Sequence, residues 1–266
     1  MSFHLPDLLA LDFDGVLCDG LREYFQSSWR AYCQIWQSQT PTPSETLEAS
    51  FSKLRHVIET GWEMPVLLRA LILGISEENI LQNWSSISQQ IVTSEQLESK
   101  NLAQTLDTLR DEWIQRDLEG WLKLHRFYPG VADKVRQILA SRETEIFIIT
   151  TKEGRFARQL LQQQGIEFPP DAIIGKESKR PKYETLRQIM EETGKERVWF
   201  VEDRLKTLRS LQQQADLQTV RLYLADWGYN TEKERKSVQE DSSIQLLSLT
   251  RFSDNFIVWD SPSLNS

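Results

Sequence analysis

Two kinds of hydrophobic pattern divide the chain. From residue 128 onward, short continuous apolar runs alternate with stretches whose apolar residues recur at helical spacing. Continuous runs are typical of strands that are buried on both faces of a parallel sheet. The runs lie at residues 145–150, 172–174, 198–201 and 219–224, and the helical stretches at residues 131–140, 154–164, 183–193 and 205–213. This alternation predicts βαβ units in one parallel sheet, and the apolar run at residues 8–11 is expected to join it.

Residues 21–124 show helical spacing and no convincing strand. Ser44 and Ser76 stand where helix N-caps are favoured, and residues 93–116 predict one long polar helix. We therefore predict that a helical bundle, residues 20–125, is inserted into a discontinuous α/β domain made of residues 1–19 and 126–266. The charged residues 232–243 predict a solvated loop or helix. Residues 244–260 add an element whose type the pattern leaves open.

Composition narrows the class of protein. The chain has 266 residues, 39% of them hydrophobic, which is enough to form a core. A net charge of -8 argues against a nucleic-acid partner, because such a partner requires a basic face. Two cysteines imply no disulfide framework and favour a reducing compartment. No apolar run approaches the ~20 residues that span a membrane, and the first residues lack a signal-peptide pattern. We therefore expect a cytoplasmic protein without a membrane partner.

The carboxyl ends of the expected strands carry acidic residues. Asp12 ends the first run and Asp14 follows it before a turn at Gly15, while Glu202 and Asp203 end the run at residues 198–201. Ligands bind at this edge of an open parallel sheet, where the strand ends meet. Buried carboxylates repel one another and resist desolvation, and a divalent cation relieves both effects. Mg²⁺ is the usual cation for a site made of oxygen ligands.

A hydroxyl and several cations complete this set. Thr150 ends the second expected strand, and Lys179, Arg180 and Lys182 follow the third. In phosphoryl transfer one carboxylate attacks phosphorus, a second moves protons, and a hydroxyl and an ammonium hold the phosphate oxygens. Lys182 opens the following helix and is our first choice for the phosphate contact, with Lys179 second. Arg180 stays an alternative because a guanidinium also binds phosphate. Lys152, after Thr150, adds positive charge nearby.

These motifs resemble those of the haloacid dehalogenase (HAD) superfamily, on its phosphatase branch with a helical C1-type cap. The similar stretches are residues 9–16, 146–150 and 200–204. The resemblance implies a Rossmann-like parallel-sheet core of the α/β class with an inserted all-helical cap domain. It also implies that Asp12 is a nucleophile that forms an aspartyl-phosphate, and that Asp14 is the general acid/base. The implied metal ligands for Mg²⁺ are Asp12, Asp14, through its backbone carbonyl, Glu202 and Asp203. Thr150 is implied to hydrogen-bond the phosphoryl group.

The expected function is that of a Mg²⁺-dependent phosphatase acting on a small phosphorylated metabolite, similar to phosphoglycolate phosphatases. Asp14 favours phosphate chemistry over carbon–halogen cleavage, because similar dehalogenases lack an aspartate there. A phosphomutase on the same core and a catalytically silent regulatory or binding protein remain alternatives. The substrate and the oligomeric state stay open. Residues 227–230, Trp-Gly-Tyr-Asn, follow the last core strand and are expected near the cleft without an assigned role.

Overall fold

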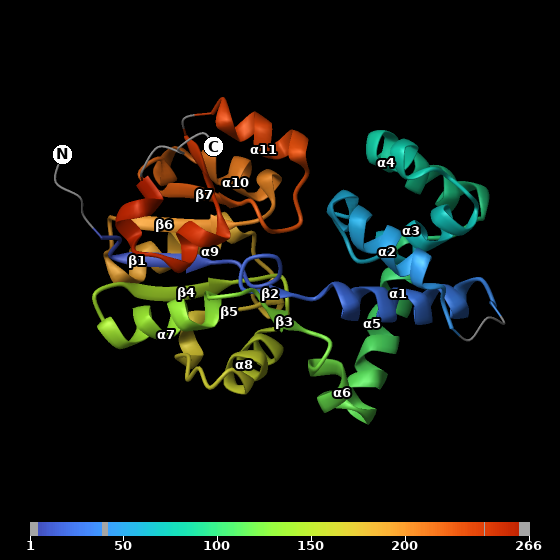
Figure 1. The fold of residues 1–266 in the computed structure, drawn as a ribbon, viewed down its shortest axis with the longest axis horizontal. Helices are drawn as coiled ribbons and strands as arrows, with labels where there is room; N and C mark the ends of the chain where they lie inside the picture. Colours follow the sequence, from blue (N-terminus) through green and yellow to red (C-terminus); the bar gives the residue numbers. More distant parts are fainter. Residues whose placement is uncertain (1–4, 39–41, 242, 261–266) are drawn as a thin grey trace. The chain divides into compact units, whose positions relative to one another are not determined.

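The computed structural model describes residues 5–38, 42–241 and 243–260. The chain divides into two compact units, and it crosses from one to the other between Asp19 and Gly20 and between His125 and Arg126. The crossing segments pair as two short antiparallel strands, β2 (Cys18–Asp19) and β3 (Arg126–Phe127). The second unit is therefore an insertion in the first, and its described residues form helices and no strand (Figure 1).

A six-stranded parallel sheet lies at the centre of the first unit, in the order β5–β4–β1–β6–β7–β8. All residues of β1 and β6 are buried, which explains why these segments are continuously apolar rather than alternating. The predicted α/β class, with a Rossmann-like parallel sheet and an inserted helical region, is confirmed. The strands are β1 (Leu8–Leu11), β4 (Glu145–Ile149), β5 (Ile173–Ile174), β6 (Val198–Glu202), β7 (Arg221–Ala225) and β8 (Ile244–Leu247).

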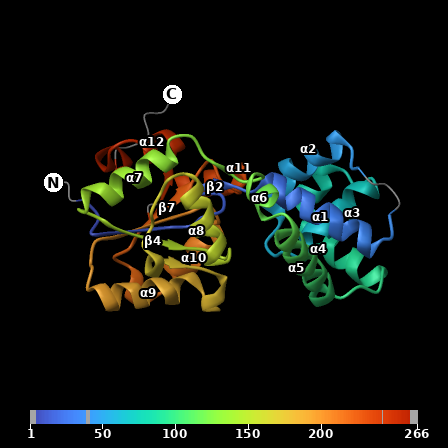
Figure 2. The same cartoon turned by 90° about the horizontal axis from the view of Figure 1, so that it is seen from below.

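Helices cover both faces of this sheet. α7 (Val131–Ser141) and α12 (Leu249–Ser253) lie on one face, and α9 (Lys182–Thr193) and α10 (Leu205–Gln212) lie on the other (Figure 2). Successive strand residues point to opposite faces, so Leu8 and Ala10 share one buried cluster with Leu186 of α9 and Leu208 of α10. α8 (Gly154–Gln163) follows β4, and α11 (Glu232–Gln239) follows β7. The loops that lead from the strands to the following helices therefore start at the carboxyl ends of the strands, at one edge of the sheet.

Residues 244–260, whose type the sequence left open, cover one face of the sheet with aromatic side chains. They form β8, α12 and a 3-10 helix, Phe256–Asp260. The rings of Trp259 and Trp199 of β6 have centroids 5.5 Å apart, and Phe252 stacks on Trp259 at 5.3 Å. All three side chains are buried, and large aromatic residues contribute strongly to burial energy.

The second unit is helical, as expected. Ser44 and Ser76 accept hydrogen bonds from the backbone N–H groups of Leu47 and Asn79, so both predicted N-caps are confirmed. The prediction of one helix over residues 93–116 was wrong, because the chain turns at Gln96 in a left-handed conformation (φ 54°). The apolar residues keep helical spacing across this break and so do not reveal it. The helices are α1 (Leu21–Ile35), α2 (Glu45–Leu54), α3 (Glu63–Ile72), α4 (Glu77–Ser94), α5 (Ser99–Arg116) and α6 (Leu118–Leu122).

A buried carboxylate connects three helices of the second unit. Glu23 of α1 is 1% exposed, and its Oε1 accepts hydrogen bonds from Arg110 of α5 (2.7 Å), Trp121 of α6 (3.1 Å) and Ser27 (2.5 Å). A buried charge is tolerated only when it is paired and hydrogen-bonded, as Glu23 is. At least one tryptophan of this unit therefore serves its internal packing.

Candidate active site

Strand register brings Asp12 and Glu202 to the same edge of the sheet. Leu11 pairs with Val201, and the N–H of Asp12 donates to the Val201 carbonyl at 2.9 Å. The residues that follow this pair, Asp12 and Glu202, therefore lie side by side at the carboxyl ends of β1 and β6. Leu11 also pairs with Ile148 of β4, so Thr150 leaves the sheet at this edge too. Residues from distant parts of the chain meet here because parallel strands end together.

Asp12, Glu202 and Asp203 form a buried carboxylate cluster. One oxygen atom from each residue lies within 4.8 Å of the others, and the residues are 6%, 0% and 1% exposed. Burial and the nearby Glu202 charge raise the pKa of Asp12 to about 7. Burial and the Asp12 charge raise the pKa of Asp203 to about 6, and burial also raises the pKa of Glu202. Without a cation these groups hold protons at a pH at which exposed carboxylates are ionised.

Lys182 supplies positive charge to this cluster. Its ammonium nitrogen lies 2.8 Å from Asp12 Oδ1 and 2.7 Å from Glu202 Oε2, and the side chain is 11% exposed. Burial by itself lowers the pKa of Lys182, but the Asp12 and Glu202 carboxylates outweigh this effect and raise it. Lys179 and Arg180, the other two candidates, are exposed. Of the three side chains, the structure thus places Lys182 at the cluster.

The surroundings of Asp203 fit a bound metal ion. Its Oδ2 accepts a hydrogen bond from the N–H of Tyr229 at 2.7 Å, whereas its buried Oδ1 has no hydrogen-bond partner in the structure. A buried carboxylate oxygen without a donor is costly unless a cation binds it. Carboxylate oxygens are also the ligands that Mg²⁺ takes in proteins. The donor set, the short separations and this orphaned oxygen therefore suit a hard divalent cation.

Asp14 and Thr150 lie in the loops at the same edge. Asp14 follows β1, and its Oδ1 lies 3.2 Å from the ammonium of Lys152, with side-chain exposures of 14% and 8%. Gly15 comes next with φ 87°, a conformation that glycine adopts readily. Thr150 is buried, and its hydroxyl oxygen accepts the N–H of Lys152 at 3.1 Å. That hydroxyl keeps its own proton to donate to a ligand.

Two features of the site were not resolved at the sequence level. Lys152 was expected only to add positive charge, but the structure pairs it directly with Asp14. Tyr229 had no assigned role, and its backbone N–H holds Asp203. A backbone donor leaves no trace in residue type. The one hint in the sequence is the glycine at position 228. A side chain there would not fit, because its Cβ would lie 2.3 Å from the Cβ of Asp203.

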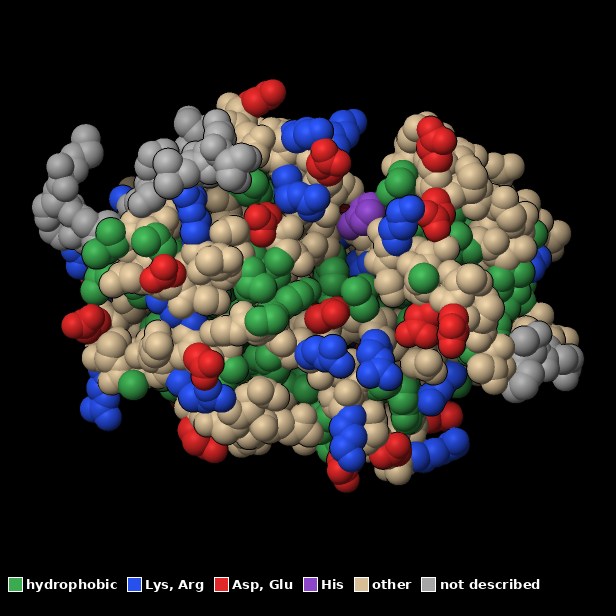
Figure 3. Space-filling view, viewed as in Figure 1, with side chains coloured by type: hydrophobic (Ala, Val, Ile, Leu, Met, Phe, Trp, Pro, Cys, Tyr) green, Lys and Arg blue, Asp and Glu red, His purple; other side chains and the backbone are tan. Residues whose placement is uncertain are grey.

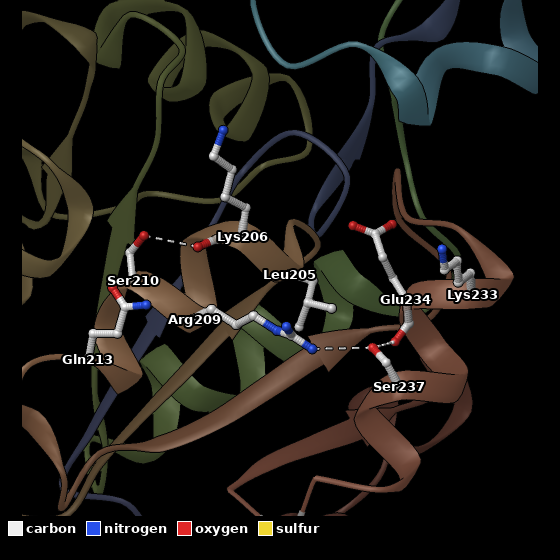
Figure 4. Close-up of a pocket in the computed structure, with 8 residues that line it drawn as sticks. All are labelled: Leu205, Lys206, Arg209, Ser210, Gln213, Lys233, Glu234 and Ser237. Carbon is white, nitrogen blue, oxygen red and sulfur yellow. Dashed lines mark hydrogen bonds between the residues drawn. The ribbon is translucent and has the colours of Figure 1, made fainter. Parts of the chain in front are cut away.

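A separate cavity lies between α10 and α11, and the cluster residues do not line it. Its volume is about 740 Å³, and Lys206, Arg209 and Lys233 stand in its wall (Figure 4). The carboxylate in this wall, Glu234, is engaged with Thr231 in the capping box that begins α11.

On the faces visible in Figure 3, acidic and basic side chains are interspersed on each unit. No helix within the described ranges has the length and apolar character needed to cross a membrane.

Comparison with known proteins places the chain in a family. A family model for haloacid dehalogenase-like hydrolases matches residues 6–213, and the chain belongs to this family, as its motifs predicted. Among solved structures, a predicted phosphatase from Clostridium acetobutylicum is 15% identical with a TM-score of 0.60, covering 94% of this chain and 97% of that one. A predicted phosphoglycolate phosphatase from Haemophilus somnus is 16% identical with a TM-score of 0.55, covering 85% and 88%. These likenesses show the shared fold. No curated protein is found to match the chain.

Proposed function

We propose that this hydrolase is a Mg²⁺-dependent phosphatase that cleaves a small phosphorylated metabolite through an aspartyl-phosphate on Asp12. The observation that carries the proposal is the position of the Asp12 carboxylate. Its Oδ1 accepts hydrogen bonds from the N–H of Phe13 (2.7 Å) and lies 2.8 Å from Lys182 Nζ. These contacts fix the plane of the carboxylate and leave Oδ2 as the oxygen that attacks phosphorus.

The metal would be held by Asp12, Glu202, Asp203 and the backbone carbonyl of Asp14. Asp203 Oδ1 has the clearest need for a cation, because it is buried without a hydrogen-bond partner. Glu202 also holds Lys182 in place, because its Oε2 accepts a hydrogen bond from Lys182 Nζ. Its Oε1 accepts the N–H of Arg204 at 3.0 Å. When bound, Mg²⁺ supplies positive charge that offsets the repulsion between Asp12 and an incoming phosphate.

The protein groups then carry the reaction in two displacements. Asp12 Oδ2 attacks phosphorus and the bond to the substrate alcohol breaks, while Asp14 gives the leaving oxygen its proton. Asp14 next removes a proton from water, which attacks phosphorus, releases inorganic phosphate and restores the Asp12 carboxylate. Lys152 holds Asp14 in place, and Lys182 and the Thr150 hydroxyl bind the phosphoryl oxygens. The family resemblance supports this division of roles.

The test is phosphate release from an activated aryl phosphate, with and without Mg²⁺, followed by a panel of phosphorylated metabolites. Asp12→Asn is expected to abolish release, because an amide is a poor nucleophile. Asp7→Asn is the matched control, because Asp7 lies just before the other end of β1, in an exposed ion pair with Arg197. Equal turnover by the two variants would refute the proposal, and conversion of a substrate to its isomer without phosphate release would indicate a phosphomutase.

A further inference from the structure

The loop after β7, residues 226–230, binds the metal-site carboxylate on one side. The N–H of Tyr229 donates to Asp203 Oδ2 at 2.7 Å, and the side-chain amide of Asn230 donates to the Asp203 carbonyl at 3.0 Å. Gly228 packs so closely that a Cβ there would lie 2.6 Å from the Gly15 carbonyl oxygen. Tyr229 and Asn230 are 7% and 6% exposed. The loop is therefore packed directly against Asp203.

The same loop binds the segments that lead into the helical unit. The Tyr229 hydroxyl donates to Asp19 Oδ1 at 2.9 Å, and Asp19 is the residue after which the chain crosses into that unit. The indole N–H of Trp227 donates to the Val16 carbonyl at 3.1 Å, and its ring centroid lies 6.4 Å from that of Tyr128. Val16 precedes β2 and Tyr128 follows β3, so the loop contacts the chain beside both crossing segments.

Two arginines, one before α10 and one in α11, donate hydrogen bonds to the loop. Arg204, which precedes α10, donates to the Tyr229 carbonyl at 3.0 Å, and Arg235 of α11 donates to the Asn230 carbonyl at 3.0 Å. With its carbonyl, N–H and hydroxyl all engaged, Tyr229 cannot shift without breaking one of these hydrogen bonds. A displacement at Asp203 would therefore strain the hydrogen bond between Tyr229 and Asp19.

We propose that Tyr229 is a positioning residue that couples metal binding at Asp203 to the placement of Asp19, where the chain leaves for the helical unit. The inference rests on the proposed metal site. A cation bound by Asp203 would restrict the rotation of its carboxylate and so keep Oδ2 on the Tyr229 N–H. The Tyr229 hydroxyl extends this restraint to Asp19. Coupling between two sites is reciprocal, so an ordered Asp19 also favours the metal.

Hydrogen exchange measured by mass spectrometry tests this coupling, with Mg²⁺ alone as the ligand. The amides that matter are those of residues 17–20 and 126–130, because residues closer to Asp14 would be protected directly by a cation on its carbonyl. They include those of Cys18, which donates to the Phe13 carbonyl, and Tyr128, which donates to the Leu17 carbonyl. In the parent protein, saturating Mg²⁺ is expected to slow exchange at these amides about threefold or more, because ordering lowers local opening. Mg²⁺ affinity is measured in parallel by calorimetry.

Tyr229→Phe removes the hydroxyl and keeps the backbone N–H. It is expected to bind Mg²⁺ within about twofold of the parent while losing the protection of residues 17–20. Asp19→Ala should lose the same protection, and the double variant should lose no more, as expected for one shared contact. Tyr223→Phe is the matched control, because it removes a phenol hydroxyl from β7 in the same unit and should keep the protection.

Full Mg²⁺-dependent protection in Tyr229→Phe would overturn the coupling. So would a parent protein that binds Mg²⁺ but shows no protection, and neither result touches the proposed hydrolysis, which is measured by phosphate release. Failure of the parent to bind Mg²⁺ would overturn the coupling together with the metal site. Loss of phosphate release with the exchange pattern intact would count only against the proposed function.

Discussion

The ammonium nitrogen of Lys182 lies 2.8 Å from Oδ1 of Asp12, inside a cluster that contains two further carboxylates. Lys182→Met would leave these buried carboxylates without their protein cation. We expect phosphate release to fall about 10²–10³-fold, because a preorganised positive group is lost. The metal-free protein should also lose about 3–5 kcal/mol of unfolding free energy, as when one partner of a buried ion pair is removed. Turnover and denaturant unfolding measure the two effects.

Lys179→Met is the control for this variant. Lys179 is exposed and belongs to the same connection between β5 and α9, so its replacement should leave both turnover and stability nearly unchanged. If the two variants lose activity equally, Lys182 has no special role. If Lys179→Met alone loses activity, the phosphate contact was assigned to the wrong lysine.

The stabilisation by Mg²⁺ should depend on pH. The folded-state pKa values of Asp12 and Asp203 are raised from 3.8 to about 7 and about 6, so the metal-free folded state binds more protons than the unfolded state between these values. Its stability therefore falls as pH rises from about 4 to about 7. Mg²⁺ binds the ionised carboxylates and displaces these protons. The gain in Tm on adding Mg²⁺ should thus be larger at pH 8 than at pH 5.5, as thermal unfolding can measure. An equal or larger gain at pH 5.5 would contradict this linkage.

Gly228 is expected to matter for metal affinity. An added Cβ would lie 2.3 Å from the Asp203 Cβ, closer than real contacts allow, so Gly228→Ala must displace Asp203 or the loop. Residues that orient metal ligands change affinity about 10–100-fold when mutated, and we expect a loss of Mg²⁺ affinity in that range by calorimetry. Gly61→Ala is the control, since its nearest neighbour would be Leu106 Cδ2 at an ordinary 3.5 Å. Unchanged affinity in Gly228→Ala would show that Asp203 is not held by close packing.

Glu23 is expected to dominate the stability of the helical unit. Glu23→Ala removes the nearer carboxylate from Arg110, whose side chain is 21% exposed, and leaves it only the more distant Asp107 at 3.8 Å. The expected loss is about 3–5 kcal/mol in denaturant unfolding. Glu112→Ala removes an exposed i,i+4 partner of Arg116, so its effect should stay within about 1 kcal/mol. Similar losses in both variants would mean that burial of Glu23 adds nothing to its pairing.

Much of the first unit follows from sequence alone, because its strands are buried on both faces. Residues 8–11 are wholly apolar and end at Asp12, which fixes both the strand and its polar end. Parallel strands also share one ligand-binding edge, so the sequence places Glu202 and Asp203 at the edge that carries Asp12. The N-cap roles of Ser44 and Ser76 could be predicted because an N-cap side chain bonds to the backbone of its own helix.

The remaining features depend on geometry that residue types do not encode. The sequence favours Lys182 over Lys179 because Lys182 opens a helix, but its 2.8 Å approach to Asp12 Oδ1 is visible only in the folded chain. The break at Gln96 is a local backbone turn within an unbroken apolar spacing. The hydrogen bond that holds the Asp203 carboxylate comes from the backbone N–H of Tyr229, a donor that nearly every residue possesses.

The most direct test of the central claim is to trap the covalent intermediate. An acyl phosphate is reduced by borohydride, which would convert a phosphorylated Asp12 into homoserine that peptide mass spectrometry detects. During turnover of an aryl phosphate with Mg²⁺, we predict homoserine at residue 12 and none at residue 14, and no conversion when substrate is omitted. Steady phosphate release with residue 12 unmodified, or homoserine at another aspartate, would contradict the assignment of Asp12 as the nucleophile.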